Sequence, residues 1–455
     1  MRKRLSMMLG LLAAVSFAYG QAQNPECMQN LSIFAEHAKV KNYEAAFEPW
    51  KMVFETCPEL HFATYAYGEK ILKDRIKNDE ANKPAYINTL MEVYKKGPEY
   101  FPKRYTKAGS MIDIALLKFD NDMANDEELF SLLDEAFKED AEHFKNPKAL
   151  YLYFSTLVDL HKAGKKDLQE VFDTYDAVTG KISEENRDLA EIIMKYVEKD
   201  SAGTLTSKEK TRLKNARING ESYEKISSSI DSKLGGLADC ENLIPLYQKN
   251  FDSHKNDAKW LRSAAGRMDD KGCTGDPMFV KLVEALDALE PSAQSKYFLG
   301  SLYEEQGDRS KALDFFNQSV ELETDKYKKA TKLLSIASKA KKRGQKTTAY
   351  KYAKQSLSVN PSEGRAYMLI ASLYADSANE CGTNTFEKKA VYWRAAAMAR
   401  KAGQVDPSMG SSASKAAAAY EGRAPSRSEI FNSGMQGQSI KFNCWVGGSV
   451  KVPSL

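Results

Sequence analysis

The residues with the clearest potential for chemistry are six cysteines spread widely along the chain. They are Cys27, Cys57, Cys240, Cys273, Cys381 and Cys444. A zinc site needs close clusters such as C-x2-C, and a redox-active pair needs C-x-x-C, but the sequence contains neither. We therefore expect structural disulfides, and metal binding and free thiols are the weaker alternatives.

The five histidines do not form a catalytic pattern. They are His37, His61, His143, His161 and His254. The sequence has no HExxH, G-x-S-x-G, G-x-G-x-x-G or P-loop motif, and the Gly164-Lys165-Lys166 stretch lacks the upstream glycine and strand of a phosphate site. We therefore predict that the chain is not an enzyme and uses no cofactor, catalytic residue or metal.

Two charged regions need a separate interpretation. Asp120, Asp122 and Asp126 loosely resemble a calcium loop, but Asn125 replaces the glycine and Ser131 replaces the bidentate glutamate. A helix N-cap explains this run more simply. Basic clusters at 328–329 and 339–343 could attract anionic lipid, polysaccharide or nucleic acid. Acidic residues on the neighbouring helices favour a solvated face instead, so we predict no nucleic-acid partner.

The first twenty residues have the layout of a secretory signal peptide. Arg2, Lys3 and Arg4 precede an apolar run over 5–18, and small residues at 18 and 20 suit a signal peptidase. A buried N-terminal helix is the alternative. Cys27 lies seven residues past Gly20, which argues against a lipid anchor. Of the net charge of +4, three charges belong to this segment, so the mature chain carries about +1. We expect no transmembrane span in it.

The elements that carry these residues are helix pairs with a spacing near 34 residues. Counting Ala293 as position 1 places Gly300 at position 8, Tyr303 at 11, Ala312 at 20 and Phe316 at 24. Further copies begin at Ala330, Gly364 and Cys27. This pattern resembles the tetratricopeptide repeat (TPR), in which small residues at 8 and 20 allow two helices to approach closely.

Between these copies the sequence predicts amphipathic helices joined by longer loops. Their ranges are 61–77, 85–96, 106–119, 127–137, 147–163, 168–178 and 186–197, followed by a linker at 201–207 and a charged helix to about 232. At the end of the chain, apolar residues alternate around a Gly447-Gly448 turn, which predicts a β-hairpin that caps the last repeat. The predicted fold is all-α, a TPR-like right-handed α-solenoid with a short C-terminal hairpin.

The helix pairs predict how the cysteines combine. In an antiparallel pair, the start of the first helix lies beside the end of the second, so Cys27 should meet Cys57. Cys240 and Cys273 have the same relation. Cys381 and Cys444 would then join the tail to the last repeat.

The TPR resemblance also implies a binding face. Inward positions of the first helix in each repeat are typically 2, 5, 9, 12 and 13. In this sequence they give the candidate partner-binding residues Gln294, Tyr297, Ser301, Glu304, Glu305, Arg365, Met368, Ser372 and Asp376. The alternative is that these are ordinary exposed helix residues.

The whole layout resembles the exported TPR proteins of Bacteroidota envelopes. This resemblance implies a scaffold for protein-protein interaction, secreted across the inner membrane and located in the periplasm or at the outer membrane. Its partners would be other envelope proteins, with a role in envelope assembly or secretion. A carbohydrate-binding or carbohydrate-processing repeat protein is the alternative. The expected divisions are 1–20 (signal peptide), 21–200 (N-terminal repeats), 201–237 (linker and charged helix), 238–423 (C-terminal repeats) and 424–455 (hairpin tail).

Overall fold

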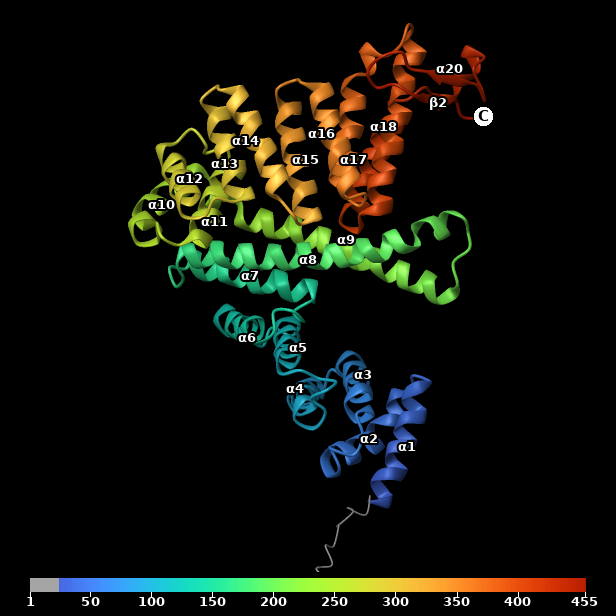
Figure 1. Ribbon diagram of the computed structural model, residues 1–455. Coiled ribbons are helices and arrows are strands. Elements are labelled where there is room, and N and C mark those ends of the chain that lie inside the picture. The colour runs from blue at the N-terminus through green and yellow to red at the C-terminus, as the bar shows by residue number, and fades with distance from the viewer. Residues whose placement is uncertain (1–23) are drawn as a thin grey trace, which may run out of the picture. The chain divides into compact units, whose positions relative to one another are not determined.

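The computed structural model describes residues 24–455, so the predicted signal peptide lies outside the described residues. The chain divides into two compact units, residues 1–125 with 131–144 and residues 126–130 with 145–455. We refer to them as unit 1 and unit 2. The described chain is almost entirely helical, with one small two-stranded sheet. The predicted all-α fold of helix pairs is confirmed (Figure 1).

Unit 1 is built from consecutive helices that pack as neighbours. They are α1 (Pro25–Lys39), α2 (Tyr43–Thr56), α3 (Ala63–Asn78), α4 (Lys83–Tyr100) and α5 (Lys107–Asp120), and α6 (Asp126–Glu139) crosses the unit boundary. Asn42 caps α2 by accepting a hydrogen bond from the Ala45 amide. At the centre, the fully buried Trp50 indole donates to the Thr64 carbonyl at 2.7 Å. Gly68 faces the same indole, which explains why no side chain occupies that position.

Unit 2 begins with three helices that precede the C-terminal repeats. They are α7 (Pro147–Lys162), α8 (Leu168–Ser201) and α9 (Ser207–Leu234), followed by the short turn η1 (Gly235–Ala238). The sequence predicted two helices where α8 runs unbroken. The helix continues through Gly180, and directly after it buried Lys181 and Glu185, one turn apart, form an ion pair at 2.8 Å. Helical glycine costs only about 1 kcal/mol, so one such residue does not end a long helix.

The remaining helices of unit 2 follow in pairs. They are α10 (Cys240–His254), α11 (Ala258–Asp270), α12 (Pro277–Leu289), α13 (Ala293–Glu305), α14 (Arg309–Leu322), α15 (Lys326–Lys342), α16 (Lys346–Val359), α17 (Gly364–Asp376), η2 (Ala378–Glu380), α18 (Thr385–Val405), η3 (Pro407–Met409), α19 (Gly410–Glu421) and α20 (Arg427–Ser433). Pairs α13–α14, α15–α16 and α17–α18 pack tightly against each other, as the repeat register predicts. Gly300 faces the Phe316 ring across the first pair.

Helix α9 crosses the end of this repeat array (Figure 1). Its Gly220 lies directly under Pro407 of η3. One turn further along, the Glu224 carboxylate accepts hydrogen bonds from the amides of Ser411 and Ser412, both at 3.1 Å. An acidic side chain at a helix N-terminus satisfies free amides and interacts favourably with the helix dipole. The middle of the chain thus fixes the start of α19.

All six cysteines are paired as the helix geometry predicts. Cys27 bonds to Cys57, Cys240 to Cys273 and Cys381 to Cys444, with Cα–Cα distances of 6.4, 5.7 and 5.2 Å. The first bond lies in unit 1, and the others lie in unit 2. Each of the first two joins the beginning of one helix to the end of a later element.

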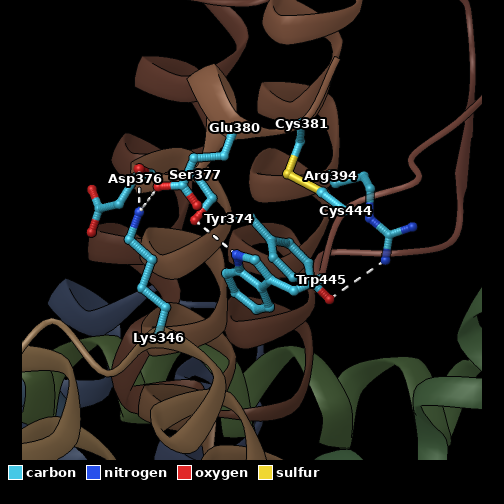
Figure 2. The surroundings of a disulfide bond; sticks show 9 residues. All are labelled: Lys346, Tyr374, Asp376, Ser377, Glu380, Cys381, Arg394, Cys444 and Trp445. Carbon is cyan, nitrogen blue, oxygen red and sulfur yellow. Dashed lines mark hydrogen bonds and ion pairs between the residues drawn. A yellow bond between two sulfur atoms is a disulfide. The ribbon is translucent and has the colours of Figure 1, made fainter. Parts of the chain in front are cut away.

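The predicted hairpin is present but shorter than expected. Strands β1 (Ser439–Lys441) and β2 (Ser449–Lys451) pair antiparallel, with Ile440 opposite Val450. The sequence alternation suggested a strand through Val446, but the disulfide of Cys444 and the packing of Trp445 hold this stretch outside the ladder. Figure 2 shows the Trp445 indole beside Tyr374, with its Nε1 donating to the Ser377 hydroxyl at 3.2 Å.

Candidate partner-binding face

Two of the predicted binding residues on α13, Gln294 and Tyr297, contact lysines of α15, and a third, Ser301, is buried. The Lys332 ammonium donates to the Gln294 side chain at 2.6 Å, and it also lies 5.5 Å from the centre of the Tyr297 ring. Lys339 approaches the same ring at 5.8 Å. Tyr297 and Ser301 are buried, with 7% and 2% of their surface exposed. Neither side chain is therefore on the surface of the chain.

The acidic residues near the end of α13 also have partners within the chain. Glu304 forms ion pairs with Arg343 at 2.7 Å and with Lys339 at 3.6 Å. Glu305 accepts a hydrogen bond from the Thr274 hydroxyl at 3.3 Å. The Glu304 contacts join α13 to the C-terminal end of α15, and the Glu305 contact joins α13 to the loop before α12, so these polar residues have a structural role.

The predicted residues on α17 are similarly engaged. The Lys341 ammonium donates to the Ser372 hydroxyl at 2.7 Å and pairs with Asp376 at 3.2 Å. Arg365 pairs with the neighbouring Glu363, and Met368 packs partly buried on an alanine cluster. The basic cluster at 339–343 thus contacts the helices on both sides of α15. A partner-binding role for these residues stays a prediction.

Lys332 is the most strongly perturbed base of this region. Burial lowers its pKa to about 8, and the carboxylate of Glu323, 4.0 Å away, acts in the opposite direction. Desolvation favours the neutral amine, whereas a nearby negative charge favours the ammonium. The Gln294 amide oxygen accepts a hydrogen bond from the buried Lys332 amine.

Unit 1 presents the same repeat positions with open space above them. Counting Cys27 as position 1 puts Leu31 and Ala35 of α1 at positions 5 and 9. The next helix of this type, α3, has Tyr65 and Glu69 thirty-four residues later, so these occupy the same positions. On α5, Gly109 and Asp113 are likewise four residues apart, and both line a pocket. These positions on α1, α3 and α5 form what we call the inner face of unit 1.

An open groove lies between α1 and α3 on this inner face. It has a volume of about 470 Å³ and is lined by Leu31, Ser32, Ala35, Glu36, Lys39, His61, Phe62, Ala63, Ala66, Tyr67 and Lys70. Its centre is apolar, and charged side chains lie along its edges. Glu36 and Lys39 pair with each other at 2.6 Å, and both are largely exposed. An apolar floor with a polar rim is typical of surfaces that bind proteins. We call it the α1–α3 groove.

A smaller pocket lies between α3, α4 and α5. It has a volume of about 220 Å³ and is lined by Tyr65, Glu69, Val93, Tyr94, Arg104, Tyr105, Thr106, Gly109, Ser110 and Asp113. Three tyrosines and two carboxylates line it, from α3, α4, α5 and the loop before α5. The Ser110 hydroxyl donates to the Tyr94 carbonyl at 2.6 Å and fixes α5 against α4. We call it the α3–α5 pocket.

The surroundings of the α3–α5 pocket raise the pKa values of Asp113 and Tyr94. Asp113 stays open to water at the pocket mouth, yet the surrounding protein and the negative charge of Glu69 raise its pKa to about 6. Glu69 itself pairs with Lys73 at 2.6 Å and accepts a hydrogen bond from the Tyr94 hydroxyl at 3.4 Å. Burial, followed by the charge of Glu69, raises the pKa of Tyr94.

Both cavities of unit 1 lie outside the binding residues predicted from the sequence. Those residues all belong to the C-terminal repeats, although the repeat that begins at Cys27 was also recognisable. The inward positions of that first repeat include Leu31, Ala35 and Lys39, which are lining residues of the α1–α3 groove. The α3–α5 pocket was harder to find, because the loop before α5 breaks the regular spacing of the repeats.

Across residues 24–455, no three His, Cys, Asp or Glu side chains are grouped so that they could hold a metal ion. None of the helices in the same range combines the length and apolar character that crossing a membrane requires.

Comparison with known proteins adds two similar structures. No protein-family model and no curated protein sequence matches the chain. The chain is similar to a tetratricopeptide repeat protein from Parabacteroides merdae, with 12% identity, 68% of this chain and 98% of that chain covered, and a TM-score of 0.25. It is also similar to yeast Tom70, with 10% identity, 87% and 96% coverage and a TM-score of 0.25.

The fold itself defines the class of protein. Successive antiparallel helix pairs, with small residues such as Gly300 and Ala312 at the close approaches, make this a TPR-like helical-repeat protein. The assignment rests on this packing rather than on the two similar structures.

Proposed function

We propose that this chain is an exported, non-enzymatic scaffold that binds another protein of the bacterial envelope, in the periplasm or at the outer membrane. The observation that carries the proposal is the inner face of unit 1, where the α1–α3 groove offers an apolar floor and a charged rim. Repeat proteins typically bind partners on such surfaces, which extend across neighbouring repeats. A role in envelope assembly or secretion is the finer form of this proposal.

The cysteines support export. All six lie beyond the predicted cleavage site at residue 20, and all six are disulfide-bonded. Disulfides persist in oxidising compartments such as the periplasm and are rare in the cytosol. The predicted signal peptide at 1–20 also indicates export.

The partner-binding proposal can be tested by crosslinking in cells that naturally produce the chain. A photoreactive amino acid would replace Ala35, which lines the α1–α3 groove, or Lys51, which is exposed on α2 of the same unit. We expect a discrete crosslinked product with another envelope protein from position 35 and none from position 51. Equal products from both positions, or none from position 35, would count against the proposed face.

Carbohydrate binding or processing is the second candidate, and one observation favours it. The α3–α5 pocket combines tyrosine rings with two carboxylates, Glu69 and Asp113, and the pKa of Asp113 is raised, as a general acid requires. Two observations weigh against it. Glu69 is held in an ion pair with Lys73, and the pocket is smaller than the roughly 300–1,000 Å³ of most small-molecule sites. Glycan binding or hydrolysis that disappears in Asp113→Asn would favour this second function.

A further inference from the structure

Building on the proposed function, we infer that the α3–α5 pocket binds the cationic end of a lysine or arginine side chain on the partner protein. The pocket lies one repeat along from the α1–α3 groove, on the same inner face. A bound segment could therefore place an apolar side chain in the groove and a basic side chain in the pocket. This inference names the chemistry that the partner must carry.

The charges around the pocket leave one carboxylate without a partner. Glu69 is balanced by Lys73, at 2.6 Å. Arg104 also lines the pocket, but its guanidinium carbon lies 3.6 Å from the centre of the Phe62 ring, which lines the neighbouring groove. Asp113 makes no hydrogen bond or ion pair with any other residue that the structure describes. The Asp113 carboxylate is therefore available to pair with a cation from a partner.

The walls of the pocket also suit a cation. Tyr65, Tyr94 and Tyr105 come from α3, α4 and the loop before α5. The rings of Tyr65 and Tyr105 have their centres 5.9 Å apart. Aromatic faces attract ammonium and guanidinium groups, and Arg is more often found in such contacts than Lys.

The Tyr65 hydroxyl is a second polar group without a partner, on a residue that lines the pocket. The residue is 98% buried, and its hydroxyl has no hydrogen-bond partner among the described residues. A buried polar group without a partner is costly, so native proteins rarely keep one without a reason. This oxygen has almost no accessible surface, so a guanidinium or ammonium group would displace neighbouring side chains to donate to it.

The size of the pocket fits one side chain rather than a free metabolite. Its volume of about 220 Å³ is below the usual range for small-molecule sites. A long basic side chain reaches into such a space with its apolar stem while the rest of the partner stays on the surface.

The groups that face Asp113 also determine how binding should vary with pH. They are Glu69, Lys73, Tyr94, Tyr105, Arg104 and Ser110. Because the pKa of Asp113 is about 6, its carboxyl is largely protonated at pH 5 and largely ionised at pH 7 when the pocket is empty. A cation binds the ionised form better, so affinity should rise between these pH values.

The test uses the purified chain and two matched peptides, acetyl-Ala-Ala-Arg-Ala-Ala-amide and the same peptide with citrulline, which is neutral and nearly the same shape. Ligand-observed NMR would report binding of each. We expect the arginine peptide to bind at least about tenfold more tightly than the citrulline peptide, as for loss of a charged hydrogen bond. Its affinity should also rise from pH 5 to pH 7. Equal binding of the two peptides, or no binding of either, would overturn the inference.

Two variants and one control make the result specific. Asp113→Asn should abolish both the preference for arginine and the rise with pH. Tyr65→Phe should weaken binding without lowering stability, whereas a purely structural hydroxyl would lower stability when removed. Glu92→Gln alters an exposed ion pair with Lys95 on α4, outside the pocket, and should change nothing. If Asp113→Asn binds the arginine peptide as the unmodified chain does, the inference is wrong.

The outcomes also separate this inference from the proposed function. Crosslinking from position 35 together with equal binding of the two peptides would support the scaffold function. It would also show that the α3–α5 pocket does not bind a basic side chain of the partner. Binding of a glycan in the pocket, in place of the arginine peptide, would favour the second function and overturn the inference.

Discussion

Replacing Gly300 by alanine tests the helix packing on which the whole assignment depends. A Cβ atom added at Gly300 of α13 would lie 2.5 and 2.6 Å from two ring carbons of Phe316. Phe316 is buried, and its ring also packs against Tyr297 at 5.4 Å between centres. The ring therefore has little room to rotate away. The two helices must separate instead.

The magnitude follows from two opposing terms. Overpacking a buried site costs about 3 kcal/mol at the upper end of its usual range, and alanine recovers about 1 kcal/mol of helix propensity. We therefore expect Gly300→Ala to lower the free energy of unfolding by about 2 kcal/mol. Urea denaturation followed by far-UV circular dichroism would measure it.

The matched control is Gly180→Ala in α8. A Cβ at Gly180 would meet no atom within 4 Å, so only the propensity term applies and we expect a gain of about 1 kcal/mol. Both positions belong to unit 2, so both variants report on the same transition. If Gly300→Ala also stabilised the chain, the close approach of α13 and α14 would be refuted.

Three further predictions concern other parts of the chain. Replacing Cys27 and Cys57 together by serine should lower the free energy of unfolding of unit 1 by about 3–4 kcal/mol, because the bond closes a loop with a sequence separation of 30; urea titration that shows no loss would contradict this. Glu224→Ala should cost about 1–2 kcal/mol, because the amides at the start of α19 lose their acceptor; an unchanged midpoint of thermal unfolding would speak against it. The pKa of Asp113 is raised to about 6 in the folded chain, so this carboxyl keeps its proton up to a higher pH than it does in the unfolded chain. Stability from this group therefore falls as the pH rises from about 4 to about 6. Asp113→Asn should flatten that part of the pH profile, and an identical profile in the variant would show that the carboxyl is not perturbed.

The repeats could be predicted from the sequence because their signal is local and regular. Gly300, Ala312 and Phe316 are spaced as two closely packed helices require, and the pairing of Cys27 with Cys57 followed from the same geometry. The sequence predicted separate helices at 168–178 and 186–197, where α8 is continuous. The ion pair between Lys181 and Glu185 that accompanies its continuation is formed by charged residues, which a search for apolar periodicity ignores.

The binding face was only partly predictable, for a different physical reason. Position in a repeat indicates which way a residue points, but not whether a neighbouring helix covers it. Tyr297 points inward as expected, and the long side chains of Lys332 and Lys339 then close over it. In unit 1 the equivalent position holds Leu31, and the short side chains of Ala35 and Ala63 line the groove beside it, so the space stays open. The distinction depends on side chains that are distant in the sequence.

The hydrogen bonds from α19 to Glu224 have a consequence for how unit 2 unfolds. In a simple row of repeats, each repeat contacts only its neighbours, so the row can fray from either end. Glu224 and Ser411 are 187 residues apart in sequence, and such a contact opposes fraying at the C-terminal end. Opening of α19 should therefore be coupled to opening of α9, and the amides of both helices should exchange with solvent at matching rates. The last repeats and the middle of the chain would then fold as one cooperative body with high contact order, which also makes their folding slow.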